Sequence, residues 1–314
     1  MNEHFLSHDS AHIHYRWNRA LKPVLTVRAG DGILVQCRDS SDGQATRQTT
    51  AAEWMQRDTD RIHALTGPIF VEGAMPGDVL EVEIRSIRHF GWGWSSIIPG
   101  MGFLSERFKD PYFFAWELEE HYSRSMATAV VPLEPFCGVM GVAPAEHGEF
   151  RTRAPGVFGG NMDVRQLTAG TTLYLPVEVP GALFSCGDAH AAQGDGEVCV
   201  TGIESPMHAV LRFELHKGRS IPGPQFHVPG ALTPKTNSAG WYGTTGVGPD
   251  LFRNAQDAVH AMVDHISATY GLSPEDAYVL ASLVVDLKIS EIVDAGQYVV
   301  SALLPLNVFS ARSP

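Results

Sequence analysis

The feature that most constrains this chain is a strict alternation of apolar and polar residues, which recurs in short runs along the sequence. Residues 77–87 read GDVLEVEIRSI, with Leu80, Val82 and Ile84 separated by charged side chains. TTLYLPVEVPG and AVLRFELHKG repeat the pattern. A period of two places successive side chains on opposite faces of a β-sheet. With 31 Gly and 20 Pro marking frequent turns, the sequence predicts a mainly β fold with sandwich-like or barrel-like lobes.

One region departs from this pattern and predicts a helical hairpin near 250–287. The apolar residues of PDLFRNAQDAVHAMVDHISATYG recur at helical spacing, and Gly271 suits the end of a helix. Ser273 and Pro274 then mark the start of a second helix. Because GQYVVSALLPLNVF returns to a β pattern, we expect one domain over 1–314, loosely divided into a β-rich lobe 1–215 and an α+β lobe 216–314.

Residues 221–250 form a Pro/Gly-rich stretch with little periodicity. This is longer than most loops between elements of a compact domain. We expect it to act as a lid over a site or as an arm that contacts a second subunit.

The charge and the termini limit the partners and the location. Asp and Glu number 35 against 23 Lys and Arg, which gives a net charge of −12 without a compensating basic run. This balance argues against nucleic acid as a partner. The first residues lack a basic stretch followed by an apolar one, and no window is apolar enough to cross a membrane. We therefore expect a cytoplasmic protein with no membrane partner. The four cysteines form no C-x-x-C pair, which predicts reduced, buried thiols.

The stretch LFSCGDAHAAQGDGEVCVTGIE, residues 183–204, concentrates side chains that bind metals and transfer protons. On an extended strand, Asp188 and His190 point to the same side and offer a carboxylate and an imidazole to one ion. Asn161 and Asp163 have the same spacing. Oxygen-rich ligands with one imidazole suit zinc, manganese or another divalent ion. Asp188 and Asp195 also have a plainer interpretation as turn residues, since Gly-Asp pairs are common in turns.

Several other carboxylates remain open between a chemical and a structural role. Glu72 lies among apolar residues and glycines, so it is either a paired buried acid or a general acid/base. Glu204 comes at a predicted strand end, where solvation alone would explain it. The GDG at 194–196 fits a hairpin turn, and alternation from Val198 predicts a strand after it.

Four segments together resemble the acetamidase/formamidase family, whose members hydrolyse short amides and in some cases a γ-lactam. The segments are GPIFVEGAMPGDVLEVEI, GVMGVAPA, VDLKISEIVD and the long run from GVFGGNMDVRQL to VCVTGIE. The resemblance covers about residues 12 to 308. It implies a strand-rich fold of two lobes, a homodimer, and a divalent metal at or near the site, with zinc as the expected ion and its identity left open.

The resemblance also carries individual residues over to this sequence. Asn161 and Asp163 match the family's Gly-Asn-Met-Asp element, and Glu72 matches Val-Glu-Gly. Asp188, His190 and Gln193 match Gly-Asp-x-His-x-x-Gln. His14 is similar to an N-terminal His-x-x-Trp pattern. The resulting metal ligands are Asp163, Asp188, His190 and His14.

From these residues we derive a hypothesis for hydrolysis of a small neutral amide. A metal-activated water would attack the carbonyl, and Glu72 or Glu204 would transfer the proton to nitrogen. Gln193, or backbone amides near Gly159 and Gly160, would hold the oxyanion, with Asn161 also binding substrate.

The sequence also offers two alternatives to metal-assisted amide hydrolysis. The first is a metal-containing, cupin-like β-barrel binding protein, suggested by the HIH at 12–14, although the further glutamate that a cupin needs is absent. The second is thiol chemistry at Cys137, which has no lysine close in sequence. The sequence leaves open which amide is cleaved, and whether the aromatic residues of FGWGWSSIIPGMGFL line the pocket or pack beneath a loop.

Overall fold

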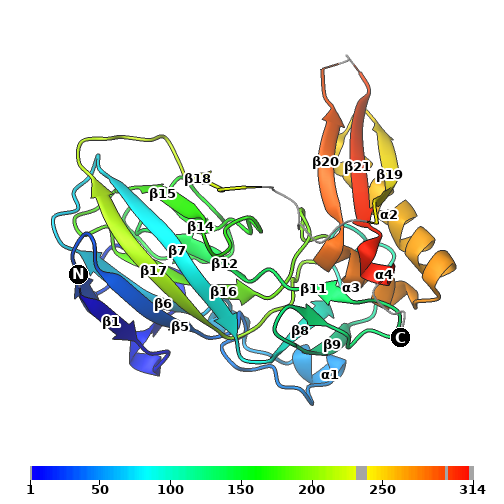
Figure 1. The fold of residues 1–314 in the computed structure, drawn as a ribbon, viewed down its shortest axis with the longest axis horizontal. Coiled ribbons are helices and arrows are strands. Elements are labelled where there is room, and N and C mark those ends of the chain that lie inside the picture. The colour runs from blue at the N-terminus through cyan, green and yellow to red at the C-terminus, as the bar shows by residue number, and fades with distance from the viewer. Residues whose placement is uncertain (1, 231–238, 294–295, 311–314) are drawn as a thin grey trace.

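The fold is described from a computed structural model, which places residues 2–230, 239–293 and 296–310. Strands hold more of the described residues than helices do, as the alternating pattern predicts. Figure 1 shows two large sheets on one side of the molecule and a small sheet with its helix on the other. Among the described residues, none of the sheets closes into a barrel.

The first large sheet has the order β1-β5-β17-β7-β15-β18. Its longest neighbours, β17 and β7, are antiparallel and pair His216 with Val79 at one end. In chain order its strands are β1 Glu3–Leu6, β5 Gly32–Cys37, β7 Val79–His89, β15 Thr172–Pro176, β17 Met207–His216 and β18 Gln225–His227.

The second large sheet has the order β14-β12-β16-β6-β2, with β4 also paired to β6. It packs face to face on the first sheet, and Phe184 of β16 contacts Phe213 of β17 with ring centroids 5.1 Å apart. Its strands are β2 Ile13–His14, β4 Leu25–Val27, β6 Leu65–Val71, β12 Phe136–Gly141, β14 Gly159–Asn161 and β16 Phe184–His190. The predicted sandwich is confirmed, and its apolar interior holds the main core.

Short elements surround the sandwich. Three two-stranded sheets pair β8 with β9, β10 with β11 and β13 with β3. These elements are β3 Arg16–Trp17, β8 Trp92–Ile97, β9 Tyr112–Glu117, β10 Tyr122–Ser123, β11 Val131–Pro132, β13 Phe150–Arg151, the 3-10 turns η1 Ser10–His12 and η2 Thr59–Arg61, and the helix α1 Ala51–Trp54.

The predicted helical hairpin is confirmed as α2 Leu251–Tyr270 and α3 Pro274–Val284. Gly271 ends α2 in the left-handed conformation, and the Ser273 hydroxyl accepts the Asp276 N–H at the start of α3. Helix α2 packs on the antiparallel sheet β19-β21-β20. The remaining elements are β19 Trp241–Gly248, β20 Asp286–Glu291, β21 Tyr298–Pro305 and α4 Asn307–Ser310.

Two local expectations come out differently. The stretch 221–250 contains β18 and β19, while its residues 231–238 lie outside the described part of the chain. Its role as a lid or arm stays a prediction. The strand expected from Val198 is wrong, because residues 198–203 form an irregular loop in which the Val198 and Thr201 carbonyls accept from side chains of α3. Within the described residues, no helix is both long and apolar enough to span a bilayer.

Candidate active site

Strand β16 carries Asp188 and His190 to one end of the sandwich. The predicted convergence of the two side chains is present: His190 Nε2 lies 3.5 Å from Asp188 Oδ1. The strand is not regular there, since Asp188 has φ 50°. Gly138 of β12 faces this irregularity, and a Cβ at that position would lie 2.5 Å from Asp163 Oδ1 and 3.2 Å from Asp188 Oδ2. A glycine at 138 therefore leaves the space that the two carboxylates occupy.

Three further acidic residues and a second imidazole complete the cluster. Glu204 Oε2 lies 3.2 Å from His190 Nε2, and His63 Nδ1 lies 3.8 Å from Asp188 Oδ2. Asp163 Oδ1 lies 4.0 Å from His190 Nδ1, and Asp163, His190 and Glu197 have atoms within 4.8 Å of one another.

Gln193 fixes the orientation of the central imidazole. Its Oε1 lies 2.8 Å from His190 Nδ1, and its Nε2 donates to the Asp163 carbonyl oxygen at 3.0 Å. Because the amide nitrogen of Gln193 is committed to that carbonyl, Oε1 accepts from Nδ1–H of His190. Nε2 of the imidazole is then left facing the carboxylates.

Burial and charge act in opposite directions on these groups. Burial lowers the pKa of His190, but the neighbouring carboxylates of Glu204 and Asp188 outweigh it and raise that pKa well above the ordinary value. Burial raises the pKa of Asp188, yet the imidazoles of His63 and His190 lower it overall. Burial raises the pKa of Asp163 to about 7. The charges of Asp188 and Glu204 add to this rise, whereas the charge of His190 opposes it. The cluster thus holds protons that a bound cation would displace.

The clearest sign of a ligand is a set of buried polar atoms without hydrogen-bond partners. Six of them belong to this cluster and its edge: His63 Nδ1, Asn161 Oδ1, Asp163 Oδ1, Asp188 Oδ1, His190 Nε2 and Glu204 Oε2. Buried polar groups are almost always hydrogen-bonded, so six such atoms around one point require a partner. Atoms of Asp188, His190 and Glu204 lie within 4.8 Å of one another, as do atoms of Asp163, His190 and Glu197. This oxygen-rich donor set with one imidazole fits a divalent cation.

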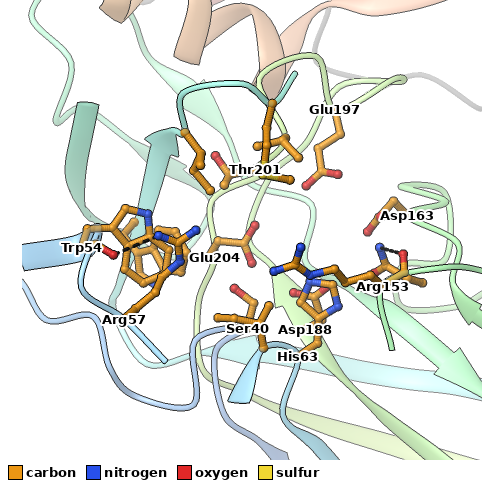
Figure 2. Close-up of a pocket in the computed structure, with 16 residues that line it drawn as sticks. Ser40, Trp54, Arg57, His63, Arg153, Asp163, Asp188, Glu197, Thr201 and Glu204 are labelled. Carbon is orange, nitrogen blue, oxygen red and sulfur yellow. Dashed lines mark hydrogen bonds and ion pairs between the residues drawn. The ribbon is translucent and has the colours of Figure 1, made fainter. Parts of the chain in front are cut away.

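A pocket with a volume of about 150 Å³ opens over the cluster. Figure 2 shows Asp188, Glu204, Asp163 and Glu197 facing its interior, with Arg57 and Arg153 entering from opposite sides. Apolar side chains complete the wall, namely Trp54, Ile62, Trp94, Ile98, Met101 and Val200. Trp94, Ile98 and Met101 come from the aromatic-rich segment 90–104, which therefore contributes to the pocket.

Backbone strain also concentrates here. Asp163, Asp188, Glu197 and Val200 line the pocket with φ of 49°, 50°, 42° and 77°. They are four of the seven non-glycine residues with positive φ in the described chain. Such conformations cost free energy and gather at functional sites. The strain and the unpartnered atoms therefore point to the same place.

Comparison with known proteins assigns the family. Residues 2–149 and 145–311 match the Acetamidase/Formamidase family. The chain belongs to this family. It is accordingly a hydrolase that acts on the C–N bond of amides.

Relatives of this acetamidase/formamidase agree along most of its length. It is 26% identical to the acetamidase of Mycolicibacterium smegmatis, over 85% of this chain and 84% of that protein. It is 28% identical to the formamidase of Methylophilus methylotrophus, over 71% of this chain and 69% of that protein. Among solved structures, the acetamidase from Bacillus halodurans is 30% identical with a TM-score of 0.68, covering 98% of each chain. The γ-lactamase from Delftia acidovorans, at 24% identity, shares the fold with a TM-score of 0.89 over 96% of this chain and 90% of that one. Family membership and the open sheets together exclude the cupin-like barrel as the fold.

Not every residue proposed from the sequence reaches the pocket. Glu72 lies on the surface, where its carboxylate accepts from Arg28 Nε at 2.8 Å, and its side chain is 47% exposed. The apolar neighbours of Glu72 in sequence belong to the buried strand β6, which ends one residue earlier, so the carboxylate itself turns outward.

His14 also lies apart from the cluster. Its Nδ1 contacts the Arg16 carbonyl oxygen at 2.9 Å, and its Nε2 contacts Ser185 Oγ at 2.8 Å. With both ring nitrogens bonded, the structure leaves His14 no free atom for a metal.

Gly159 and Gly160 pair with β12 and do not line the pocket, whereas Asn161, next to them, does. Their positive φ values of 94° and 93° favour glycine. A Cβ on Gly159 would lie 2.5 Å from the Met140 carbonyl oxygen. The two glycines thus allow β14 to approach β12 and deliver Asn161.

Six polar residues of the pocket were not identified from the sequence as site residues: Ser40, Arg57, His63, Arg153, Glu197 and Thr201. Most lie in loops far from residues 183–204, so no local pattern connects them to that stretch. Glu197 and Thr201 are the exceptions, because both follow the GDG turn within it.

The thiol alternative finds no support in the geometry. Cys137 is buried in the core with Cys37 and Cys186. The pKa of Cys137 is raised well above its ordinary value. Contact with Cys186 lowers this pKa, but contact with Cys37 and burial raise it by more. A buried neutral thiol is a poor nucleophile.

Proposed function

We propose that this protein hydrolyses short primary amides to a carboxylate and ammonium with the help of a divalent cation. The observation that carries the proposal is the convergence of six unpartnered buried polar atoms, five of them on residues that line one pocket, in an acetamidase/formamidase. A cavity of about 150 Å³ suits a ligand of roughly benzene's size. That size matches a short acyl chain.

The residues that would hold the cation are Asp188, His190 and Glu204, with Asp163 adjacent. A divalent cation bound there supplies a water of lowered pKa and polarises the amide carbonyl. Zinc is the expected ion, because a mixed carboxylate and imidazole set suits it.

The remaining groups bind the amide and move its proton. Asn161 Oδ1 is buried, unpartnered and at the pocket, so it accepts a hydrogen bond from the amide nitrogen of the substrate. Burial raises the pKa of Glu197 well above its ordinary value, which favours the protonated form of this carboxyl. Glu197 lines the pocket and is the group placed to give that proton to the leaving nitrogen. Gln193 holds the His190 ring in position and does not touch the substrate.

The test combines ammonia release with metal analysis. Formamide, acetamide, propionamide and a γ-lactam are offered to the protein after metal depletion and after restoration of zinc or manganese. We expect turnover only in the restored protein. Asp188→Asn and His190→Asn should each lower bound metal and reduce kcat/KM by more than about 100-fold while the fold is kept.

Asp195→Asn is the matched control, since Asp195 is near in sequence but accepts from Gln166 outside the pocket. Its metal content and rate should stay close to those of the parent. Unchanged metal content and activity in both Asp188→Asn and His190→Asn would contradict the proposal.

A further inference from the structure

The pocket contains two guanidinium groups that hydrolysis of a neutral amide does not require. Arg57 follows α1, and Arg153 lies in the segment between β13 and β14. Figure 2 shows their side chains entering from opposite sides, with the Glu204 carboxylate between them. We call the four carboxylates of the pocket its acidic floor and the two arginines its basic rim.

Arg57 is held in a fixed position at this rim. Its Nη1 donates to the Trp54 carbonyl oxygen at 3.0 Å, and its guanidinium carbon lies 4.3 Å from the centre of the Trp54 ring. Trp54 is itself fixed, because its Nε1 donates to Ser96 Oγ at 3.1 Å. Stacking on an aromatic face orients a guanidinium while leaving its edge free to donate.

Neither arginine forms an ion pair with another described residue. Within the described part of the chain, no carboxylate lies within ion-pair distance of Arg57 or Arg153, although four carboxylates line the same pocket. Arg165, by contrast, is paired with both Asp286 and Glu134. Burial lowers the pKa of Arg57, and the charge of Arg153 lowers it further. Two cations that repel each other across a pocket are stabilised by an anion between them.

We propose that Arg57 and Arg153 bind a carboxylate of the substrate, so that the preferred substrate is the monoamide of a short dicarboxylic acid. This inference rests on the proposed amide hydrolysis and names its substrate class. For succinamate, water adds to the amide carbon, the C–N bond breaks, and the products are succinate and ammonium. The amide end lies over the acidic floor, and the carboxylate lies at the rim, where Arg donors bind carboxylates in a bidentate manner.

The test compares two amides of the same shape. Succinamate and 4-methylpentanamide have the same number of non-hydrogen atoms and differ in whether a carboxylate or an isopropyl group ends the chain. We expect kcat/KM for succinamate to exceed that for 4-methylpentanamide by about 10- to 100-fold, the range of a charge-assisted hydrogen bond. Arg153→Gln and Arg57→Gln should each reduce this preference toward one.

Arg151→Gln is the matched control, because Arg151 is exposed and paired with Asp60 outside the pocket. It should keep the full preference. If the two amides are hydrolysed equally well, or if the pocket variants slow both by the same factor, the arginines only balance the charge of the acidic floor and the inference is overturned.

Calorimetry with succinate separates this inference from the proposed function. If no amide releases ammonia, amide hydrolysis fails, but the parent should still bind succinate about 10-fold or more tightly than Arg153→Gln does. Equal binding of succinate by both proteins would overturn the anion site on its own.

Discussion

At the scale of single residues, His14 shows how burial changes the behaviour of a side chain whose sequence context suggested a metal ligand. Both of its ring nitrogens are hydrogen-bonded inside the protein. Burial lowers its pKa to about 4, against a smaller opposing effect of the Arg16 carbonyl. The ring is therefore neutral in the folded protein at a pH where it would be protonated in the unfolded chain.

The sign of the resulting pH dependence follows directly. Between about pH 6.5 and pH 4 the unfolded chain binds a proton at His14 and the folded protein does not, so stability falls as the pH falls through this range. The effect is at most about 3 kcal/mol. We expect His14→Asn, which cannot take up this proton, to lose less melting temperature than the parent between about pH 7.5 and about pH 5.

His121→Asn serves as the control, because the His121 side chain is 80% exposed. Its melting temperature should equal that of the parent at both values of pH. Equal losses in the parent and in His14→Asn would show that another group governs the acid response. Metal analysis of the same variant tests whether His14 binds the ion, and we expect its metal content to be unchanged.

At the scale of elements, α3 positions one wall of the pocket. Tyr278 Oη donates to the Val198 carbonyl oxygen at 2.5 Å, and Ser282 Oγ donates to the Thr201 carbonyl oxygen at 2.8 Å. Ser282 Oγ also accepts from the Cys199 N–H at 3.1 Å. The loop 198–203, which has no strand partner, is thus held by a helix that lies about 80 residues later in the chain.

Ser282→Ala tests this support. The substitution leaves the buried Cys199 N–H without its acceptor and the Thr201 carbonyl without one donor. A buried group left unsatisfied lowers the free energy of unfolding by roughly 1 to 3 kcal/mol. We expect a lower melting temperature together with a reduced kcat/KM, because Thr201 and Val200 line the pocket. Ser290→Ala, at an exposed serine of β20, is the control and should change neither. A lower melting temperature with unchanged kcat/KM would mean that the loop keeps its shape without Ser282.

The same loop shows where prediction from the sequence ends. Alternation correctly predicted β7, β15 and β17, because each has one face on the core and one toward water. The alternation after Val198 was equally regular, but the backbone there bonds to α3 instead of a strand. Local pattern does not record which distant element supplies the partner.

The candidate site divides in the same way. The spacing of Asp188 and His190 predicted their convergence, because both lie on one strand. His63 and Arg153 reach the pocket from other loops, and only the packing of the two large sheets brings them there. Glu72 lies outside the pocket for the same reason, since its direction depends on where β6 ends.

At the scale of the whole molecule, the two lobes expected from the sequence share one hydrophobic core. A single cluster of buried residues runs from Leu6 through Phe184 to Val308 and includes buried residues of both α2 and α3. A close backbone contact also joins the lobes, because a Cβ on Gly194 would lie 2.1 Å from the Val285 carbonyl oxygen. Assembly into a homodimer stays a prediction.

The shared core predicts that both lobes unfold in one transition. Five of the six tryptophans lie within residues 1–215, whereas α2 and α3, with 20 and 11 residues, supply most of the helix. Tryptophan fluorescence therefore reports on the first lobe, and circular dichroism at the helix band reports on the second. Because exposing one face of the shared core would remove apolar contacts from the other, we expect the two melting curves to coincide. Midpoints that differ by more than a few degrees, or a folded and soluble fragment 1–215, would show instead that the lobes are independent domains.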